Sequence, residues 1–324
     1  MSSTMHPDDA LFHPAGDDPW AYESYWFSFF VPDRKLMVYV YPWFRPNLGI
    51  AAGGVSAWDH TGAEPWNIVH SDYHWHLPCP AAEQMINGNT LTLPQGVKLR
   101  VLEPLSKFEI SYEHPRLSLN VRFDAIHPAV IATRPIGNSQ LFGGRIDQCG
   151  RVTGELNLGG EIIAIDCLSM RDRSWGARRD DNRDLNIGYF HATATETDAF
   201  LACSNHAAPV DGTSKDIDAP VVFGYLIKDG DYQPLSQGNV TFTRDAQGRP
   251  LTVEIRGIDA NGRALTASGS ALSYFASQPS PGLFNLSSLA TWHFNGISCT
   301  GELQNTMYPD RWRSFYHRWV SEHS

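Results

Sequence analysis

The sequence lacks the signatures of several large classes of protein. Its apolar runs fall short of the ~18 residues that a membrane-spanning helix needs. It contains no G-x-S-x-G elbow, no P-loop and no G-x-G-x-x-G that opens a helix. We therefore expect neither a membrane span nor a serine hydrolase, and the sequence offers no phosphate-binding loop for a nucleotide.

Cysteine is scarce and carries no pattern. The five cysteines are odd in number and scattered, and no C-x-x-C occurs. Neither a zinc ribbon nor a disulfide framework is supported, so we expect free thiols in a reducing compartment. The N-terminal segment has no positively charged start and no apolar stretch of the kind that a signal peptide needs. Both observations predict a cytoplasmic protein.

Positive charge is in short supply. The formal net charge is −10, which argues against nucleic acid or an anionic membrane surface as a general partner. Only five of the 25 basic residues are lysine, and the rest are arginine. Because a guanidinium prefers planar pairing to simple solvation, we expect ion pairs of defined geometry.

The sequence is rich in patterns that predict β-strands. Hydrophobic residues make up 42% and aromatic residues 12% of the chain. Short runs rich in aromatic and β-branched residues, bounded by Pro, Gly and Asp, predict strands; the clearest are residues 25–31, 36–43, 108–112 and 117–125. Turn sequences predict hairpins at residues 159–160, 196–198, 229–230, 245–248 and 259–262. This meander of antiparallel strands is typical of barrels or sandwiches.

One helix is predicted, at the C-terminus. The segment PDRWRSFYHRWVSEH places Trp312, Phe315, Tyr316 and Trp319 on one stripe at helical spacing. Pro309 stands where a helix can start. We expect this helix to close a barrel end or to pack across two barrels.

The segment CLSMRDRSWGARRDDNRD, residues 167–184, concentrates five arginines and four aspartates after a strand-like run. If the strand continues through Trp175, alternation places Asp172 on the face of Met170, which would continue the inward side of the strand. Arg171 and Arg173 would then share the opposite face with Trp175. Two interpretations stay open. Asp172 belongs to an ion-pair network between two halves of the chain, or it lies in a dry aromatic cavity where burial raises its pKa and lets it donate a proton.

The string RDRSWGAR, after a Gly-Gly hairpin, resembles a motif of a superfamily of two-domain lipocalin-like proteins that includes the bacterial carotenoid 1,2-hydratases (hydroxyneurosporene synthases) and the AttH-type proteins. Those hydratases tend to carry histidine where this chain has Arg173, so the chain is closer to a DRSWG-containing branch. The resemblance implies an all-β fold of two consecutive calycin-type barrels or half-barrels, with a cavity at or between them. It also implies chemistry on apolar, terpenoid- or polyketide-like molecules without metal or organic cofactor.

Carried onto this chain, the resemblance makes Asp172 the catalytic acid and Arg173 and Trp175 substrate-binding neighbours. We expect a flexible arm over residues 1–19, an N-terminal lipocalin-like domain over 20–176, and a C-terminal one with the helix over 177–324.

Further candidates come from the residues themselves. Tyr189 and His191 share one face of the strand that follows Asp172, and we expect them to relay protons or orient water. Trp292 and His293 are predicted to bind substrate, with His293 facing the same cavity. The H-x-H pair His74 and His76 of HSDYHWH, with His70 nearby, could supply metal ligands from one strand face. No further ligand follows in a recognisable pattern. We predict no metal site.

The sequence thus predicts a cofactor-independent hydratase, dehydratase or isomerase acting on a hydrophobic small molecule by proton transfer from Asp172. The alternative is a non-catalytic carrier for a lipid-, terpenoid- or steroid-like ligand. A third interpretation is a scaffold whose Arg/Asp segment only locks the two halves together. A homodimer is left open as the assembly state.

Overall fold

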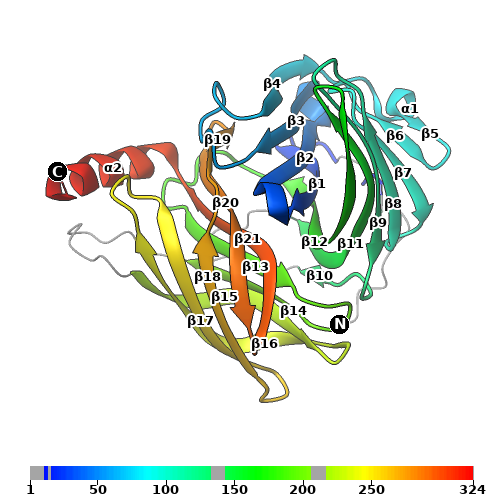
Figure 1. The fold of residues 1–324 in the computed structure, drawn as a ribbon. Coiled ribbons are helices and arrows are strands. Elements are labelled where there is room, and N and C mark those ends of the chain that lie inside the picture. The colour runs from blue at the N-terminus through cyan, green and yellow to red at the C-terminus, as the bar shows by residue number, and fades with distance from the viewer. Residues whose placement is uncertain (1–10, 14–15, 133–142, 206–216, 324) are drawn as a thin grey trace.

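Antiparallel strands make up nearly all of the regular structure in the computed structural model, which describes residues 11–13, 16–132, 143–205 and 217–323. Two large sheets and a C-terminal helix account for these residues (Figure 1). The predicted fold class is confirmed: a half-barrel is followed by a closed antiparallel barrel and the helix. No helix among the described residues has the length and apolar character needed to cross a bilayer.

The first sheet has 12 strands, and its main path runs β4-β3-β2-β1-β12-β11-β9-β8-β7-β6-β5. The edge strands β4 and β5 do not pair with each other among the described residues, so the sheet stays open as a half-barrel. Its strands are β1 (Ala21–Val31), β2 (Leu36–Arg45), β3 (Ile50–Trp58), β4 (His70–Pro78), β5 (Ile86–Asn87), β6 (Thr90–Thr92), β7 (Lys98–Glu103), β8 (Lys107–Tyr112), β9 (Leu117–Ala125), β10 (Ile131–Ala132), β11 (Gly144–Leu158) and β12 (Glu161–Ala177). A short helix, α1 (Ala82–Met85), precedes β5.

The second sheet closes on itself. Its nine strands run β18-β17-β16-β15-β14-β13-β21-β20-β19, and β18 also pairs with β20. Eight strands therefore form a closed barrel, with β19 attached outside the closure. The strands are β13 (Asn186–Thr193), β14 (Ala199–Asn205), β15 (Ile217–Lys228), β16 (Asp231–Arg244), β17 (Pro250–Asp259), β18 (Ala264–Ala271), β19 (Phe275–Ser280), β20 (Leu283–Phe294) and β21 (Ile297–Met307).

The C-terminal helix α2 (Pro309–His323) packs against this barrel through the predicted aromatic stripe. Trp312 stacks on Phe284 of β20 at a ring separation of 4.9 Å. The guanidinium carbon of Arg244 lies 4.6 Å from the centre of the Phe315 ring. The indole N–H of Trp319 donates to the carbonyl of Asp245 at 2.8 Å. The helix thus covers the turn between β16 and β17, as expected for a helix that packs onto a barrel end.

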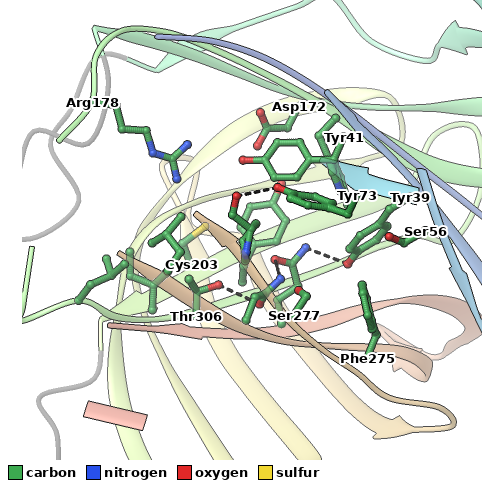
Figure 2. A pocket seen from close by; sticks show the side chains of 18 of the residues that line it. Tyr39, Tyr41, Ser56, Tyr73, Asp172, Arg178, Cys203, Phe275, Ser277 and Thr306 are labelled. Atoms are coloured by element: carbon green, nitrogen blue, oxygen red, sulfur yellow. Dashed lines mark hydrogen bonds between the residues drawn. The ribbon is translucent and has the colours of Figure 1, made fainter. Parts of the chain in front are cut away.

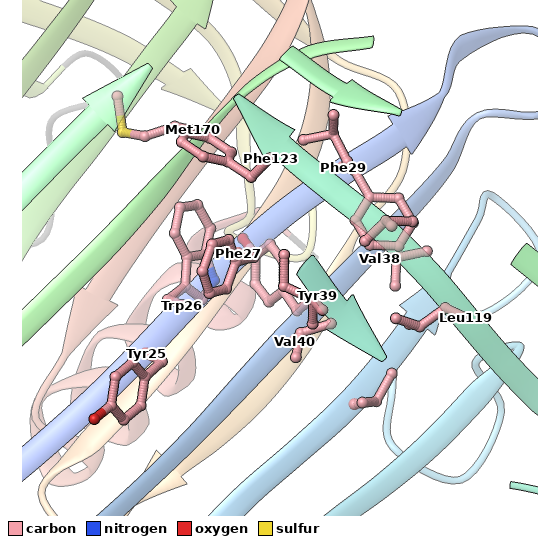
Figure 3. Close-up of a cluster of buried hydrophobic side chains, with 14 of the residues drawn as sticks. Tyr25, Trp26, Phe27, Phe29, Val38, Tyr39, Val40, Leu119, Phe123 and Met170 are labelled. Atoms are coloured by element: carbon pink, nitrogen blue, oxygen red, sulfur yellow. The ribbon is translucent and has the colours of Figure 1, made fainter. Parts of the chain in front are cut away.

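Each sheet encloses its own apolar core. In the half-barrel, the core includes Phe27 of β1 and Phe123 of β9 (Figure 3), together with Phe108 of β8. In the closed barrel, it includes Phe200 and Trp292. Full burial of such a side chain contributes roughly 1.5–3 kcal/mol relative to exposure, so the two cores are the main source of stability.

The two sheets also pack against each other, because residues of β1 alternate between two faces. Phe27 points into the half-barrel core, whereas Trp26 reaches the second sheet and meets the rings of Tyr189 and His191 edge-on, at 6.4 and 6.0 Å. Close by, Tyr39 of β2 accepts a hydrogen bond from Gln304 of β21 at 3.2 Å. A site between the sheets is therefore built by both halves of the chain.

The predicted N-terminal arm lies partly outside the described residues, which omit 1–10 and 14–15. Its described part packs onto the first sheet: Phe12 stacks on Phe44 at 5.9 Å, and His13 stacks on Trp175 at 4.1 Å. The division of the chain at residues 176 and 177 into independent domains stays a prediction.

Candidate functional site

A cavity of about 130 Å³ lies between the two sheets (Figure 2). Strands β1 to β4, β11 and β12 supply one side, and β13, β14 and β19 to β21 supply the other. Its wall is mostly aromatic and aliphatic, and includes Trp26, Tyr39, Tyr41, Tyr73, Phe275 and Leu283. Few ionisable groups interrupt it, chiefly Arg145, Asp172 and Arg178. An apolar pocket with a few convergent polar groups is the usual form of a small-molecule site.

Strand β12 places Asp172 in this cavity on the face that it shares with Met170, but this face points away from the half-barrel core and not into it. Ile163, Ile165 and Cys167 point into the half-barrel core, so the same alternation sends Arg171 and Arg173 inward. Asp172 shares the other face with Met170, which the second sheet covers. The sequence expectation that this face continues the inward side of the strand is wrong: the face is exposed at Ile162, Ala164 and Asp166 and becomes covered only near Met170 and Asp172.

The inward guanidinium groups have their partners inside the half-barrel. Arg171 donates to the Oε1 of Gln148 at 2.8 Å and lies over the Phe108 ring at 4.3 Å. Arg173 pairs with the carboxylate of Glu23. Trp175 stacks on the His13 ring. Neither Arg173 nor Trp175 is among the residues that line the cavity, so the structure separates these two predicted substrate-binding residues from Asp172.

Asp172 makes one ion pair and leaves one oxygen without a partner. Its Oδ2 lies 2.5 Å from the Nη2 of Arg145, and the same Nη2 lies 2.7 Å from the Oδ1 of Asp147. Asp147 stands directly opposite Asp172 in the register of β11 and β12. The Asp172 Oδ1 is buried and has no hydrogen-bond partner in the structure. One guanidinium therefore serves two buried carboxyl groups.

This arrangement makes Asp172 a weaker acid than an ordinary aspartic acid. Burial is the largest influence and raises the pKa of Asp172 to about 6. The Arg145 guanidinium opposes this by lowering the pKa, and the neighbouring Asp147 carboxylate raises it again. A carboxyl group with a pKa near 6 is a proton donor at a pH close to neutral.

Tyr189 lines the cavity and supports the Asp147 carboxylate. Its hydroxyl donates to Asp147 Oδ1 at 2.7 Å, and its ring lies 5.2 Å from the guanidinium carbon of Arg145. Burial raises the pKa of the Tyr189 hydroxyl well above its ordinary value. The structure thus brings Tyr189 together with Asp172 through Arg145 and Asp147, rather than by direct contact.

His191 lies beside the cavity wall but is not part of it. Its Nε2 is 3.1 Å from the Oε2 of Glu302, and both side chains are almost completely buried. Burial lowers the pKa of His191 to about 3 and raises the pKa of Glu302 well above its ordinary value. The His191 imidazole is therefore neutral near pH 7, which does not suit it to accept and hold a proton.

Trp292 and His293 lie elsewhere. The Trp292 ring packs edge-on against Phe200 inside the closed barrel, at 5.1 Å. His293 points to the other face of β20 and lines a shallow, separate depression with Ser268 and Ser298. The expectation that His293 faces the same cavity as Asp172 is therefore wrong, since β20 turns this side chain away. Within the described residues, no group of three His, Cys, Asp or Glu side chains is arranged to hold a metal ion.

Three ionisable residues of the site were not singled out from the sequence. Asp147 and Arg145 follow the segment 133–142, and their importance depends on the cross-strand register with β12. Arg178 belongs to the arginine- and aspartate-rich segment 167–184. Its position two residues after Gly176 could have marked it as a site residue. No local pattern predicts that Tyr41 and Tyr73 complete the wall.

Comparison with known proteins places the fold in a family. The family described as a domain of unknown function, DUF7064, matches residues 6–307. The chain belongs to this family. No curated protein shows significant sequence similarity to this DUF7064 protein.

Solved structures resemble the DUF7064 chain over most of its length. An AttH protein from Nitrosomonas europaea gives a TM-score of 0.58 at 14% identity, covering 89% of this chain and 92% of that one. CghA gives 0.56 at 13% identity, covering 90% and 88%. Kievitone hydratase from Nectria haematococca gives 0.49 at 15% identity, covering 89% and 88%. At these identities the likeness is one of fold.

Proposed function

We propose that this protein is a cofactor-independent acid/base enzyme, of the hydratase, dehydratase or isomerase type, acting on a hydrophobic, terpenoid- or polyketide-like molecule. One observation carries the proposal: a carboxyl group with a pKa near 6 lines an aromatic cavity, with one oxygen free of any partner. The resemblance of the RDRSWGAR segment to two-domain lipocalin-like hydratases supports the same class of reaction.

In the proposed reaction, the protonated Asp172 transfers its proton to a carbon of an alkene. The positive charge that develops on the adjacent carbon lies among the faces of aromatic side chains such as Trp26 and Tyr41, which attract cations. Water then bonds to that carbon and returns one proton to Asp172, so the sum is alkene plus water giving alcohol. Loss of a proton from a different carbon instead gives an isomerised double bond, and the reverse sequence dehydrates an alcohol.

Arg145 has a positioning role in this scheme. By holding Oδ2 of Asp172 at 2.5 Å, it fixes the carboxyl plane and leaves Oδ1 as the oxygen that carries the proton. Because Arg145 also pairs with Asp147, its charge is shared, and it opposes the proton on Asp172 less than an undivided ion pair would.

The alternative function is a carrier for a hydrophobic ligand. The observation that favours it is the mostly aromatic and aliphatic wall of the cavity, which suits a hydrophobic ligand whether or not a reaction follows. A carrier would release its ligand chemically unchanged.

The test is the Asp172→Asn variant, with Asp166→Asn as a matched control. Asp166 lies on the same strand, is exposed and pairs with Arg151. The proteins are incubated in D2O with a panel of terpenoid and polyketide alkenes and tertiary alcohols, and products are analysed by mass spectrometry for gain or loss of water and for deuterium at carbon. We expect Asp172→Asn to lose roughly 100- to 10,000-fold in turnover, with ligand binding retained, and Asp166→Asn to match the wild type.

Full turnover by Asp172→Asn would overturn the acid role. Native mass spectrometry of the purified protein distinguishes a carrier from an enzyme. A co-purifying intact lipid, with no chemical change and no deuterium in any candidate substrate, would favour the carrier function.

A further inference from the structure

Arg178 is the second cation of the cavity, and its backbone is fixed on both sides. Its N–H donates to the carbonyl of Trp20 at 2.9 Å, and its carbonyl accepts a hydrogen bond from Nη1 of Arg45 at 2.7 Å. These bonds hold the chain just after β12, and the side chain reaches into the cavity on the side where Asp172 lies (Figure 2). The backbone position from which the Arg178 side chain extends is therefore set by the fold.

The Arg178 guanidinium forms no hydrogen bond and no ion pair with any other residue in the described part of the chain. Its contact is with the Tyr22 ring, whose centre lies 4.8 Å from the guanidinium carbon. The nearby Asp180 is taken by Arg45, at 2.9 Å. A guanidinium has five N–H donors, and a cation held in a largely apolar wall without an acceptor is costly. Its donors are thus available to a ligand.

The balance of charge in the cavity indicates the sign of the charge that the ligand should carry. Arg145 is shared by Asp147 and Asp172. When Asp172 carries a proton, Arg145 and Asp147 cancel each other, and Arg178 remains as an uncompensated positive charge. The acid form of the site therefore favours a ligand with one negative charge.

We propose that Arg178 binds a carboxylate group of the substrate, so that the ligand is a hydrophobic carboxylic acid whose apolar body lies along the aromatic wall. A planar guanidinium can hold a carboxylate by two parallel N–H···O bonds, which fixes the orientation of the molecule relative to Asp172. This inference rests on the proposed function for the placement of the reacting carbon, but the binding itself does not depend on turnover.

A bound carboxylate would also act on Asp172. A second negative charge in the cavity disfavours the ionised form of that side chain and keeps the proton in place. Substrate binding would then prepare the acid for the reaction.

The experiment compares two probes of equal length, decanoate and decanamide, by isothermal titration calorimetry at pH 7. We expect the wild type to bind decanoate at least ~10-fold more tightly than decanamide, which corresponds to about 1.4 kcal/mol. Arg178→Met should abolish this preference by weakening decanoate alone. Arg179→Met is the matched control, since the neighbouring Arg179 is exposed and pairs with Asp181, and it should keep the wild-type preference.

Absence of a preference in the wild type, including failure of decanoate to bind, would overturn the proposal, and so would a preference that survives in Arg178→Met. If Arg178→Met does not fold by circular dichroism, Arg178→Gln takes its place with the same two outcomes. Asp172→Asn separates this proposal from the catalytic one: it should bind decanoate at least as tightly as the wild type whatever its effect on turnover.

Discussion

The raised pKa of Asp172 can be tested without a substrate, through its effect on stability. In the folded protein, burial holds the pKa of this carboxyl near 6, against an ordinary value of 3.8. The difference of about two pKa units corresponds to about 3 kcal/mol at 1.36 kcal/mol per unit. The folded state therefore binds this proton more tightly than the unfolded state does.

The sign of the pH dependence follows from this difference. Between pH 4 and 6 the folded protein holds the proton while the unfolded chain has lost it, so stability falls as pH rises through this range. Asparagine cannot titrate. The free energy of unfolding of the wild type minus that of Asp172→Asn should therefore decrease by about 2–3 kcal/mol from pH 4 to pH 7, and change little above pH 7.

Urea unfolding of both proteins, followed by tryptophan fluorescence at half-unit steps of pH, measures this difference. Asp166→Asn gives a control of opposite sign, because Arg151 lowers the pKa of the exposed Asp166 carboxyl and its contribution grows with rising pH. A wild-type minus Asp172→Asn difference that is flat, or that increases with pH, would mean that the Arg145 ion pair outweighs burial. Asp172 would then not hold a proton at a pH near neutral.

Three further substitutions test the packing and charge of the same region by urea unfolding at pH 7. Trp292→Ala, inside the closed barrel, should cost roughly 3–5 kcal/mol; a loss below 1 kcal/mol would contradict its place in the core. Glu302→Gln should change stability by less than about 1 kcal/mol because burial favours the protonated form of Glu302, which glutamine resembles; a larger loss would contradict a protonated Glu302. Arg145→Met should cost roughly 3–5 kcal/mol by leaving Asp147 and Asp172 buried without a cation, and an unchanged midpoint would contradict the shared ion pair.

Elements defined by local sequence could be predicted well. The hairpin at Gly159 and Gly160 lies where expected, with both glycines at positive φ, and the turn at Asp229 and Gly230 joins β15 to β16 as predicted. The aromatic stripe of α2 was also predicted, and Trp312, Phe315 and Trp319 pack on the barrel, whereas Tyr316 is 37% exposed. In these cases the turn chemistry and the periodicity act over a few residues and do not depend on distant partners.

The site was less predictable because its geometry is set by long-range pairing. Trp26 meets Asp172 only because β1 pairs with β12, and Arg145 reaches Asp172 only through the register of β11 on β12. The face of β12 that holds Asp172 becomes buried through the second sheet, which alternation within one strand cannot reveal. The motif itself was informative about Asp172, but not about Arg173 and Trp175, which serve the half-barrel interior.

The ion pair of Asp172 joins β12 to β11 within the first sheet, rather than the two halves of the chain as one interpretation from the sequence expected, and it does not exclude an acid in a dry cavity. An ion pair built for stability alone would match charges one to one, because a buried carboxyl without its own cation is costly. Here Arg145 is matched by two carboxyl groups across paired strands, while Arg178 in the same cavity forms no ion pair with any carboxylate among the described residues. Moving one proton onto Asp172 and one anion onto Arg178 removes both mismatches at once. The unequal pairing is therefore what a site that binds an acidic ligand and keeps a proton ready would need.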